Sequence, residues 1–212
     1  MSVTGLSLIL FLTFHCCMNV AAFFSKDAYN MVCGFLGSHW YAVAGTAGLA
    51  FLAVCHIVYA FILTAQNRRA RGPQRYEVTS RRPEVSWASQ NMLVLGLIIL
   101  IGLLLHLYNF WGHMMFADLA GLQFKYGPED GFAWIEDTFR SPVYSILYLI
   151  WICSLWFHLT HGFWSAMHTL GMSGKIWMKR WQCCGMVYVT ILMGIFVILI
   201  LSFWLGFAPS MR

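Results

Sequence analysis

Apolar and polar positions follow one another along this chain in long blocks rather than residue by residue. Five apolar runs, at about residues 3–24, 39–65, 91–117, 143–170 and 182–207, are separated by polar connections. Each run is long enough for a helix to cross a hydrocarbon layer of roughly 30 Å. Backbone amides cannot stay unpaired in lipid, and the alternating pattern of barrel strands is absent, so helices are expected. The pattern predicts an all-α membrane protein in which residues 1–212 form one domain with five transmembrane helices.

Composition and charge refine this picture. Of 212 residues, 60% are hydrophobic and 10% are charged, which lies outside the usual range of water-soluble domains. The net charge of +5 does not indicate a nucleic-acid partner, because the cations gather in two connections between spans. The positive-inside rule then places both connections and the N-terminus in the cytoplasm, and the C-terminus outside. These cations are Arg68, Arg69, Arg71, Arg75, Arg81, Arg82, Lys175, Lys179 and Arg180.

The start of the chain argues against a cleaved secretory signal, and its cysteines argue against a covalently attached haem. There is no Lys or Arg before Lys26, so the first run lacks the charged start of a secretory signal and is expected to be a retained span. Seven cysteines are present, but no C-x-x-C-H motif, which excludes a covalently attached c-type haem. We expect these thiols to act as small hydrophobic side chains.

Four histidines lie deep inside the predicted spans. Ionisable side chains at such depth are costly and usually functional, and imidazole is the commonest metal ligand in proteins. At 1.5 Å per residue, His15 and His106 lie about 18 and 22 Å from the cytoplasmic starts of their helices, in the outer half. His56 and His158 lie about 25 and 23 Å from the outer starts of theirs, in the inner half.

These depths sort the histidines into two pairs, His15 with His106 and His56 with His158. Each pair lies on parallel helices, which face each other diagonally in an up-down four-helix bundle. Two planar macrocycles, one above the other and each held by a diagonal pair, would satisfy both facts. A zinc or copper site would instead require three or four ligands at one level. The alternative is that each imidazole is a core side chain bonded to a neighbouring helix.

Small residues near these histidines would leave room for a macrocycle. They are Ala53 and Ala60 beside His56, Gly102 beside His106, and Ser154 and Gly162 beside His158. His161 follows His158 by three residues, and we assign the ligand role to His158, with His161 bonding a propionate or the backbone. The remaining histidines, His39, His113 and His168, lie near span ends, where solvation at the interface is expected.

Short motifs around the deep histidines carry a family resemblance. The first span has H-x-x-x-N from His15 to Asn19, and the second has H-x-V-Y from His56 to Tyr59. The third has His106 followed by aromatic residues up to Trp111, and the fourth has F-H-x-x-x-G-x-W-S in residues 157–165. In this order, over essentially the whole chain, they resemble the five-helix, two-haem cytochrome b membrane anchor of succinate dehydrogenases and fumarate reductases, the succinate:quinone oxidoreductases.

The resemblance implies a subunit that carries electrons through two haems b between a quinone, expected to be menaquinone, and an iron-sulfur subunit. That subunit would relay them to an FAD-containing flavoprotein interconverting succinate and fumarate. The haem axial ligands would be the two pairs described above, in a multi-pass protein of a bacterial cytoplasmic membrane. The whole complex could form a homodimer. No Asp or Glu lies inside a span, so a proton route would need waters or haem propionates.

An outer haem implies that quinone reacts near the outer ends of the first three spans. Candidate residues for that site are Asn19, Tyr29, Asn109, Trp111 and His113, unless they are ordinary members of the interfacial belt. The iron-sulfur subunit would dock on the cytoplasmic face, where Arg68, Arg69, Lys175 and Lys179 would contact it or a propionate, or simply obey the positive-inside rule. Two other classes fit less well: a dihaem cytochrome of another quinone-linked oxidoreductase, and a haem-free transporter.

Overall fold

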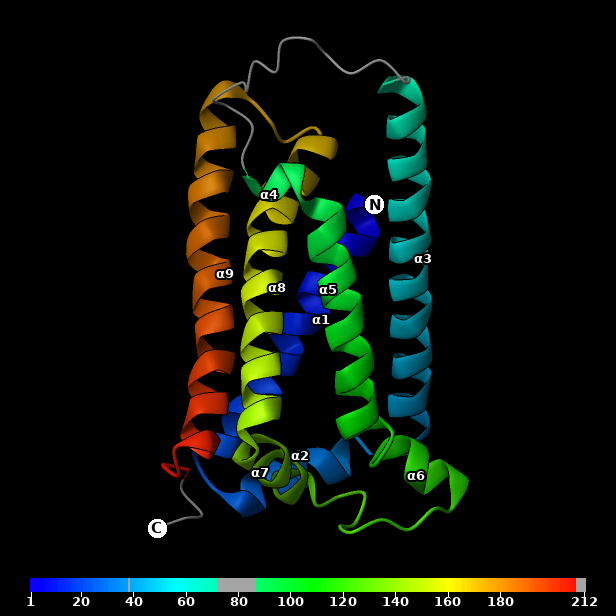
Figure 1. The fold of residues 1–212 in the computed structure, drawn as a ribbon, viewed down its shortest axis with the longest axis vertical. Coiled ribbons are helices and arrows are strands. Elements are labelled where there is room, and N and C mark those ends of the chain that lie inside the picture. The colour runs from blue at the N-terminus through cyan, green and yellow to red at the C-terminus, as the bar shows by residue number, and fades with distance from the viewer. Residues whose placement is uncertain (38, 72–86, 209–212) are drawn as a thin grey trace.

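Five long helices dominate the computed structural model, which describes residues 1–37, 39–71 and 87–208 (Figure 1). These helices are long and apolar enough to cross a membrane, and they confirm the five predicted spans. The described residues contain no strand. The spanning segments are α1 (Ser2–Val20) with the short η1 (Ala21–Phe23), α3 (Trp40–Arg71), α5 (Met92–His106) with η2 (Leu107–Trp111), α8 (Pro142–Thr169) and α9 (Lys175–Trp204).

Several helix ends differ from the predicted boundaries. The third run was expected to continue to residue 117, but α5 ends at His106, a π-helical turn follows to Trp111, and α6 (Met115–Ala120) is separate. Helix α3 continues to Arg71, and α9 begins at Lys175, seven residues before the predicted start of its run at residue 182. A helix need not stop where hydrocarbon stops, because its backbone bonds are satisfied in water too. Pro142 begins α8, as expected for a first helical turn.

The order of the helices around the bundle decides which side chains meet. Helix α1 packs against α3, α8 and α9, α5 packs against α8, and α8 and α9 form the most extensive pair. Thus α1 and α5 lie across the bundle from each other, as do α3 and α8. The remaining side, between α3 and α5, departs from the expectation that consecutive spans are close neighbours, because few close backbone contacts join them in the described ranges.

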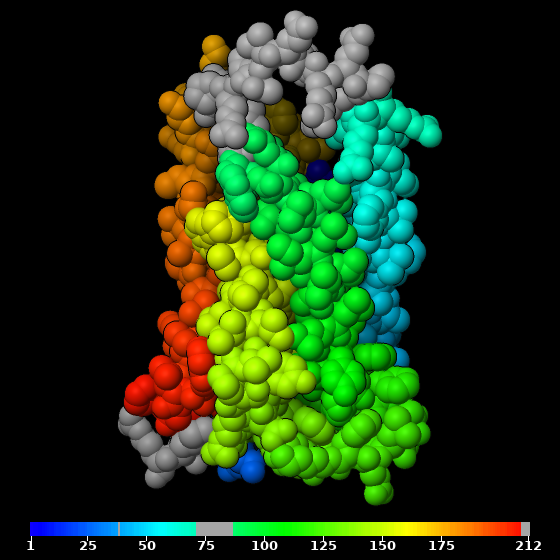
Figure 2. Space-filling view, viewed as in Figure 1, coloured from blue at the N-terminus to red at the C-terminus, as the bar shows by residue number. Residues whose placement is uncertain are grey.

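Helices α3 and α9 form opposite edges of the bundle (Figures 1 and 2). The most hydrophobic stretch of α3 contains no buried residue, whereas a third of the corresponding stretch of α9 is buried. The packed core lies between α1, α7, α8 and α9 and includes Cys16, Phe132, Tyr148 and Val189. Helix α3 is therefore the least embedded span in this bundle.

Three short helices close one end of the bundle, which we call the cap end: α2 (Lys26–Phe35), α6 and α7 (Gly131–Arg140) (Figure 1). The sequence predicted connections at α2 and α7, and it predicted the start of α6 as the end of the third span. The polar residues 127–131 gave no indication of the amphipathic α7 that follows. The opposite end carries α4 (Trp87–Gln90) and the start of α9, with Arg68, Arg69 and Lys175. We call it the basic end.

Hydrogen bonds at the start of α2 and between α2 and α7 stabilise the cap. The Ser25 hydroxyl accepts a bond from the Ala28 N–H and so begins α2, at 3.0 Å. The side-chain oxygen of Asn30 accepts a 3.0 Å bond from the Phe132 N–H at the start of α7. Gly131 is required at this contact, because a Cβ there would collide with Cys33 Sγ. The two helices consequently form one layer over the spans.

Candidate functional site: two histidine pairs

The pair nearer the cap end joins His15 of α1 to His106 of α5. Their ring centres lie 5.7 Å apart, with the ring planes almost perpendicular at 89°. Aromatic rings surround them: Phe11 stacks on His15 at 5.6 Å, and Trp151 lies 5.5 Å from His106. The sequence had grouped these two histidines by depth alone, and the fold brings them together.

The pair nearer the basic end joins His56 of α3 to His158 of α8. The ring centres are 6.4 Å apart and the planes are inclined at 68°. His56 Nδ1 lies 3.1 Å from the hydroxyl oxygen of Thr4, on the first turn of α1. Three spans therefore meet at this level, and Thr4 is a participant that no sequence motif indicated.

Three buried imidazoles have a ring nitrogen without a hydrogen-bond partner among the described residues. Nδ1 of His106, His158 and His161 is buried and has no hydrogen-bond partner among the described residues. An unsatisfied buried polar group costs about 1–3 kcal/mol, so native proteins rarely leave several together. If these histidines were core side chains bonded to neighbouring helices, their Nδ1 atoms would have hydrogen-bond partners. These three imidazoles are therefore not core side chains with both ring nitrogens bonded to described neighbours, and His161 shares this state although it belongs to neither pair.

The spacing within each pair suits two imidazoles bound on opposite sides of one metal ion. With metal–nitrogen bonds of about 2 Å, two such rings hold their centres on the order of 6 Å apart. The described residues contain no group of three or more His, Cys, Asp or Glu side chains that could hold a metal ion. Ligands that come in twos suit a metal carried in a macrocycle, which supplies the other four, as in haem. The residues present therefore fit haem iron.

The small residues beside the histidines are used in different ways. Gly102 was expected to leave room for a macrocycle, but this prediction is wrong, because the Trp151 side chain occupies the space that a Cβ there would need. Gly162 does have open space, since a Cβ added there meets nothing within 4 Å. The same is true of Gly45, Gly48 and Gly96. Gly194 on α9 and the turn glycines Gly121 and Gly171 are open as well, so open space beside a glycine is not confined to the level of the histidines.

An apolar cleft of about 620 Å³ separates α1 from α3 on the cap side of His56. Phe11, which stacks on His15, lines it together with Gly45 and Gly48. Gly45 and Gly48 carry no side chain to fill this space, and a Cβ at either position would meet nothing within 4 Å. Together with the absence of buried residues along the hydrophobic stretch of α3, this cleft provides room for a large planar group beside the histidines.

The other histidines are placed differently from the two pairs. His161 packs its ring against Trp164 at 4.8 Å rather than against His56. His39 stacks on Tyr41 near the cap end, and His168 is exposed at the end of α8. His113 lies among aromatic side chains at the cap end.

Two buried amides lie beside the cap-side pair. Asn19 donates a 2.8 Å bond to the His15 carbonyl and accepts one of 3.2 Å from the Tyr29 hydroxyl. Asn109, on the π-helical turn, donates a 3.2 Å bond to the hydroxyl of Tyr148. Tyr148 is almost fully buried and its ring lies 6.2 Å from that of His106, but no motif had indicated it. These groups form a polar cluster within an apolar surround.

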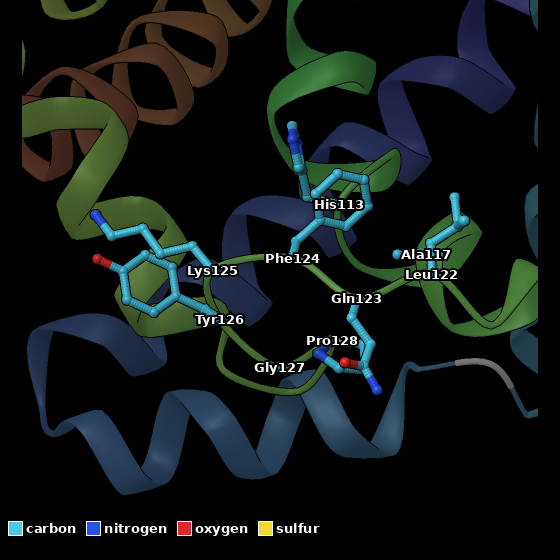
Figure 3. Close-up of a pocket in the computed structure, with 9 residues that line it drawn as sticks. All are labelled: His113, Ala117, Leu122, Gln123, Phe124, Lys125, Tyr126, Gly127 and Pro128. Atoms are coloured by element: carbon cyan, nitrogen blue, oxygen red, sulfur yellow. The ribbon is translucent and has the colours of Figure 1, made fainter.

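Trp111 and His113 lie farther toward the cap surface. Trp111 is partly exposed and packs on Phe116. His113 Nδ1 lies 2.7 Å from the Tyr108 carbonyl oxygen, and its ring is flanked by Phe124 at 4.6 Å and Trp134 at 4.8 Å. It borders a cavity of about 200 Å³ in the loop between α6 and α7 (Figure 3). The carbonyl contact assigns the proton to Nδ1 and leaves Nε2 as the acceptor.

Comparison with protein-family models, with curated proteins and with solved structures finds no match to this chain. The assignment of a function therefore depends on the geometry of the histidine pairs and on the sequence motifs around them.

Proposed function

We propose that this chain is the membrane-anchor cytochrome b subunit of a succinate dehydrogenase or fumarate reductase complex. It would carry electrons through two haems b between a quinone and an iron-sulfur subunit. The quinone is expected to be menaquinone. The observation that carries the proposal is the arrangement of four intramembrane histidines as two pairs, with ring centres 5.7 and 6.4 Å apart. The motifs around them support the particular family.

The residues of the chain have separate tasks in this proposal. His15 and His106 would hold one haem iron, and His56 and His158 the other. When bound, haem iron supplies a centre that accepts and releases one electron at a time. The spans and the surrounding lipid would keep water from both levels, and the identity of the histidine ligands, their hydrogen bonds and their burial would set the reduction potentials. Asn19, Tyr29, Asn109 and His113 would form or border a quinone site at the cap end.

The distribution of charge supports an orientation for the subunit. The basic end carries Arg68, Arg69, Lys175 and Lys179, and the cap end carries most of the acidic residues that the structure describes. The positive-inside rule assigns the basic end to the cytoplasm. The iron-sulfur and FAD-containing subunits would dock there, and the N-terminus would be cytoplasmic in a bacterial membrane.

A haem determination on the purified protein tests the proposal directly. We expect a pyridine haemochrome assay to give two haems b per chain, and a dithionite-reduced minus oxidised spectrum to show low-spin b-type bands. Purification of the tagged chain from its native membrane should bring an iron-sulfur protein and a flavoprotein that oxidises succinate. A colourless preparation would support the haem-free transporter instead. Two haems with a nickel-iron or molybdenum partner would assign the chain to another quinone-linked oxidoreductase.

A further inference from the structure

The first turn of α1 contacts a histidine of the neighbouring helix. Thr4 Oγ1 lies 3.1 Å from His56 Nδ1 and 2.9 Å from the carbonyl oxygen of Met1. Gly5 lies beside the same ring, where a Cβ would make an ordinary contact of 3.4 Å with His56 Cε1. Of the four paired imidazoles, His56 is the one that a side-chain hydrogen bond reaches within the described residues.

The two contacts of the Thr4 hydroxyl determine the direction of both hydrogen bonds. A hydroxyl has one hydrogen and two acceptor lone pairs. The Met1 carbonyl oxygen can only accept, and it also accepts the helical bond from the Gly5 N–H, so both Thr4 contacts are hydrogen bonds at once when the Thr4 hydrogen is donated to Met1. The bond between Thr4 and His56 is then made by an Nδ1–H donating to the hydroxyl oxygen. His56 therefore carries its proton on Nδ1 and keeps the lone pair of Nε2 for a metal.

The partner histidine has no such contact. Nδ1 of His158 is buried without a hydrogen-bond partner, and so is Nδ1 of His106 in the other pair. An N–H donated to an oxygen makes the opposite nitrogen of a histidine a more basic ligand. Stronger donation from the ligand stabilises the oxidised, more positive state of the iron. The Thr4 contact thus makes the two histidine pairs chemically unequal.

We infer that Thr4 is a positioning residue that holds His56 in its Nδ1-protonated form and lowers the reduction potential of the haem bound between His56 and His158. This inference rests on the proposed dihaem function. The residue acts through His56 and does not itself contact the metal. Because Thr4 is a neutral alcohol in an apolar span, its effect comes from one hydrogen bond and not from a charge.

The test is a redox titration of three purified variants and the wild type, followed by visible spectroscopy and electron paramagnetic resonance. Thr4→Val keeps the shape of the side chain and removes the hydroxyl, whereas Thr4→Ser keeps the hydroxyl. Thr64→Val is the matched control: it removes a hydroxyl from the same helix as His56, and among the described residues this hydroxyl donates to the Ala60 carbonyl at 2.8 Å.

In Thr4→Val we expect one haem to become easier to reduce by about tenfold in its oxidised-to-reduced ratio, equivalent to about 59 mV for one electron. Its ferric resonance signal should move, while the second haem, Thr4→Ser and Thr64→Val stay at wild-type values. Loss of that haem in Thr4→Val with retention in Thr4→Ser would support the same inference.

Unchanged potentials in a Thr4→Val protein that retains both haems would overturn the inference, and so would equal shifts or equal haem loss in Thr4→Val and Thr4→Ser. Failure of the proposed function has a different signature. In that case the wild-type protein itself would contain no haem, or one haem, before any variant is compared.

Discussion

The indole ring of Trp151 lies in the space that Gly102 leaves on the facing helix. A Cβ at Gly102 would collide with this ring, and the indole N–H donates a 3.0 Å bond to the carbonyl of Ile99 on the same helix α5. The ring of Trp151 also lies 5.5 Å from that of His106. Gly102 thereby brings α5 and α8 together and indirectly sets the position of one paired histidine.

Substitution of Gly102 by Ala should therefore disturb the cap-side pair. Overpacking a close contact costs roughly 1–3 kcal/mol, and here the displaced group is the Trp151 ring beside His106. We expect a lower midpoint of thermal unfolding in detergent and a reduced content of one haem. Gly96→Ala is the control, since a Cβ at Gly96 meets nothing within 4 Å. Equal behaviour of the two variants would show that Trp151 adjusts freely.

The histidine pairs predict which substitutions share a spectral effect. Because His15 lies beside His106, replacing either by Ala should remove one and the same haem component. Replacing His56 or His158 should remove the other, whereas His161→Ala should retain both. Reduced minus oxidised spectra of the five variants decide this. If His56→Ala and His106→Ala lost the same component, the pairing would be rejected.

The sequence was most informative where the physical constraint is local. An apolar run must become a helix in lipid, and a histidine inside it has a depth that follows from helical rise. The five spans and the grouping of His15 with His106 and of His56 with His158 could be obtained in this way. The helix ends could not be predicted in this way, because α3 and α9 continue beyond their apolar runs into charged turns, where water can hydrogen-bond the polar groups.

Contacts between distant parts of the chain could not be predicted from local sequence patterns. Gly102 was taken as room for a macrocycle because nothing in its neighbourhood indicates that Trp151 fills the space. Thr4 and Tyr148 carry no motif, and their importance appears only when α1 meets α3 and α8 meets α5. The helices α2 and α7 were missed because each is short and becomes stable by packing against the other and the spans.

The cap should loosen in alkali through Cys33. Burial raises the pKa of this thiol from 9.0 to about 11, although hydrogen bonds from Tyr29 and the Gly131 backbone act in the opposite direction. Since the folded pKa is raised, the stabilisation is complete below about pH 9 and is lost as pH rises through about 11. Two pKa units correspond to roughly 2–3 kcal/mol.

Thermal unfolding of the wild type and of Cys33→Ala, compared from pH 8 to pH 11, measures this contribution. We expect the stability difference between the two proteins to shrink as the pH rises through that window. Burial raises the pKa of Tyr29 as well, and contact with Cys33 raises it further, so Tyr29→Phe and the Tyr29→Phe/Cys33→Ala double variant are compared over the same pH range to separate the two groups. A difference that stays constant with pH would show that the Cys33 thiol does not titrate in the folded cap.

The last prediction concerns where quinone reacts. Two buried hydrogen-bonded pairs, Asn19 with Tyr29 and Asn109 with Tyr148, lie beside the cap-side histidines. A quinone needs an apolar cleft with a few convergent polar groups, and these two pairs supply such groups beside His15 and His106. Tyr29→Phe and Asn109→Leu each remove one partner with little change in volume.

In a purified complex, both variants should lower quinol-coupled activity by about tenfold or more, because loss of one hydrogen bond to a quinone costs on the order of 1.4 kcal/mol. Succinate oxidation with an artificial dye should persist, since the dye takes its electrons from the other subunits. Asn91→Leu, which removes a bond to the Trp87 carbonyl at the basic end, is the matched control. If Asn91→Leu or changes at Trp164 and Ser165 abolished quinol activity while the cap variants did not, the quinone would react at the basic end. The cap-side haem would then have to exchange electrons only with its neighbour.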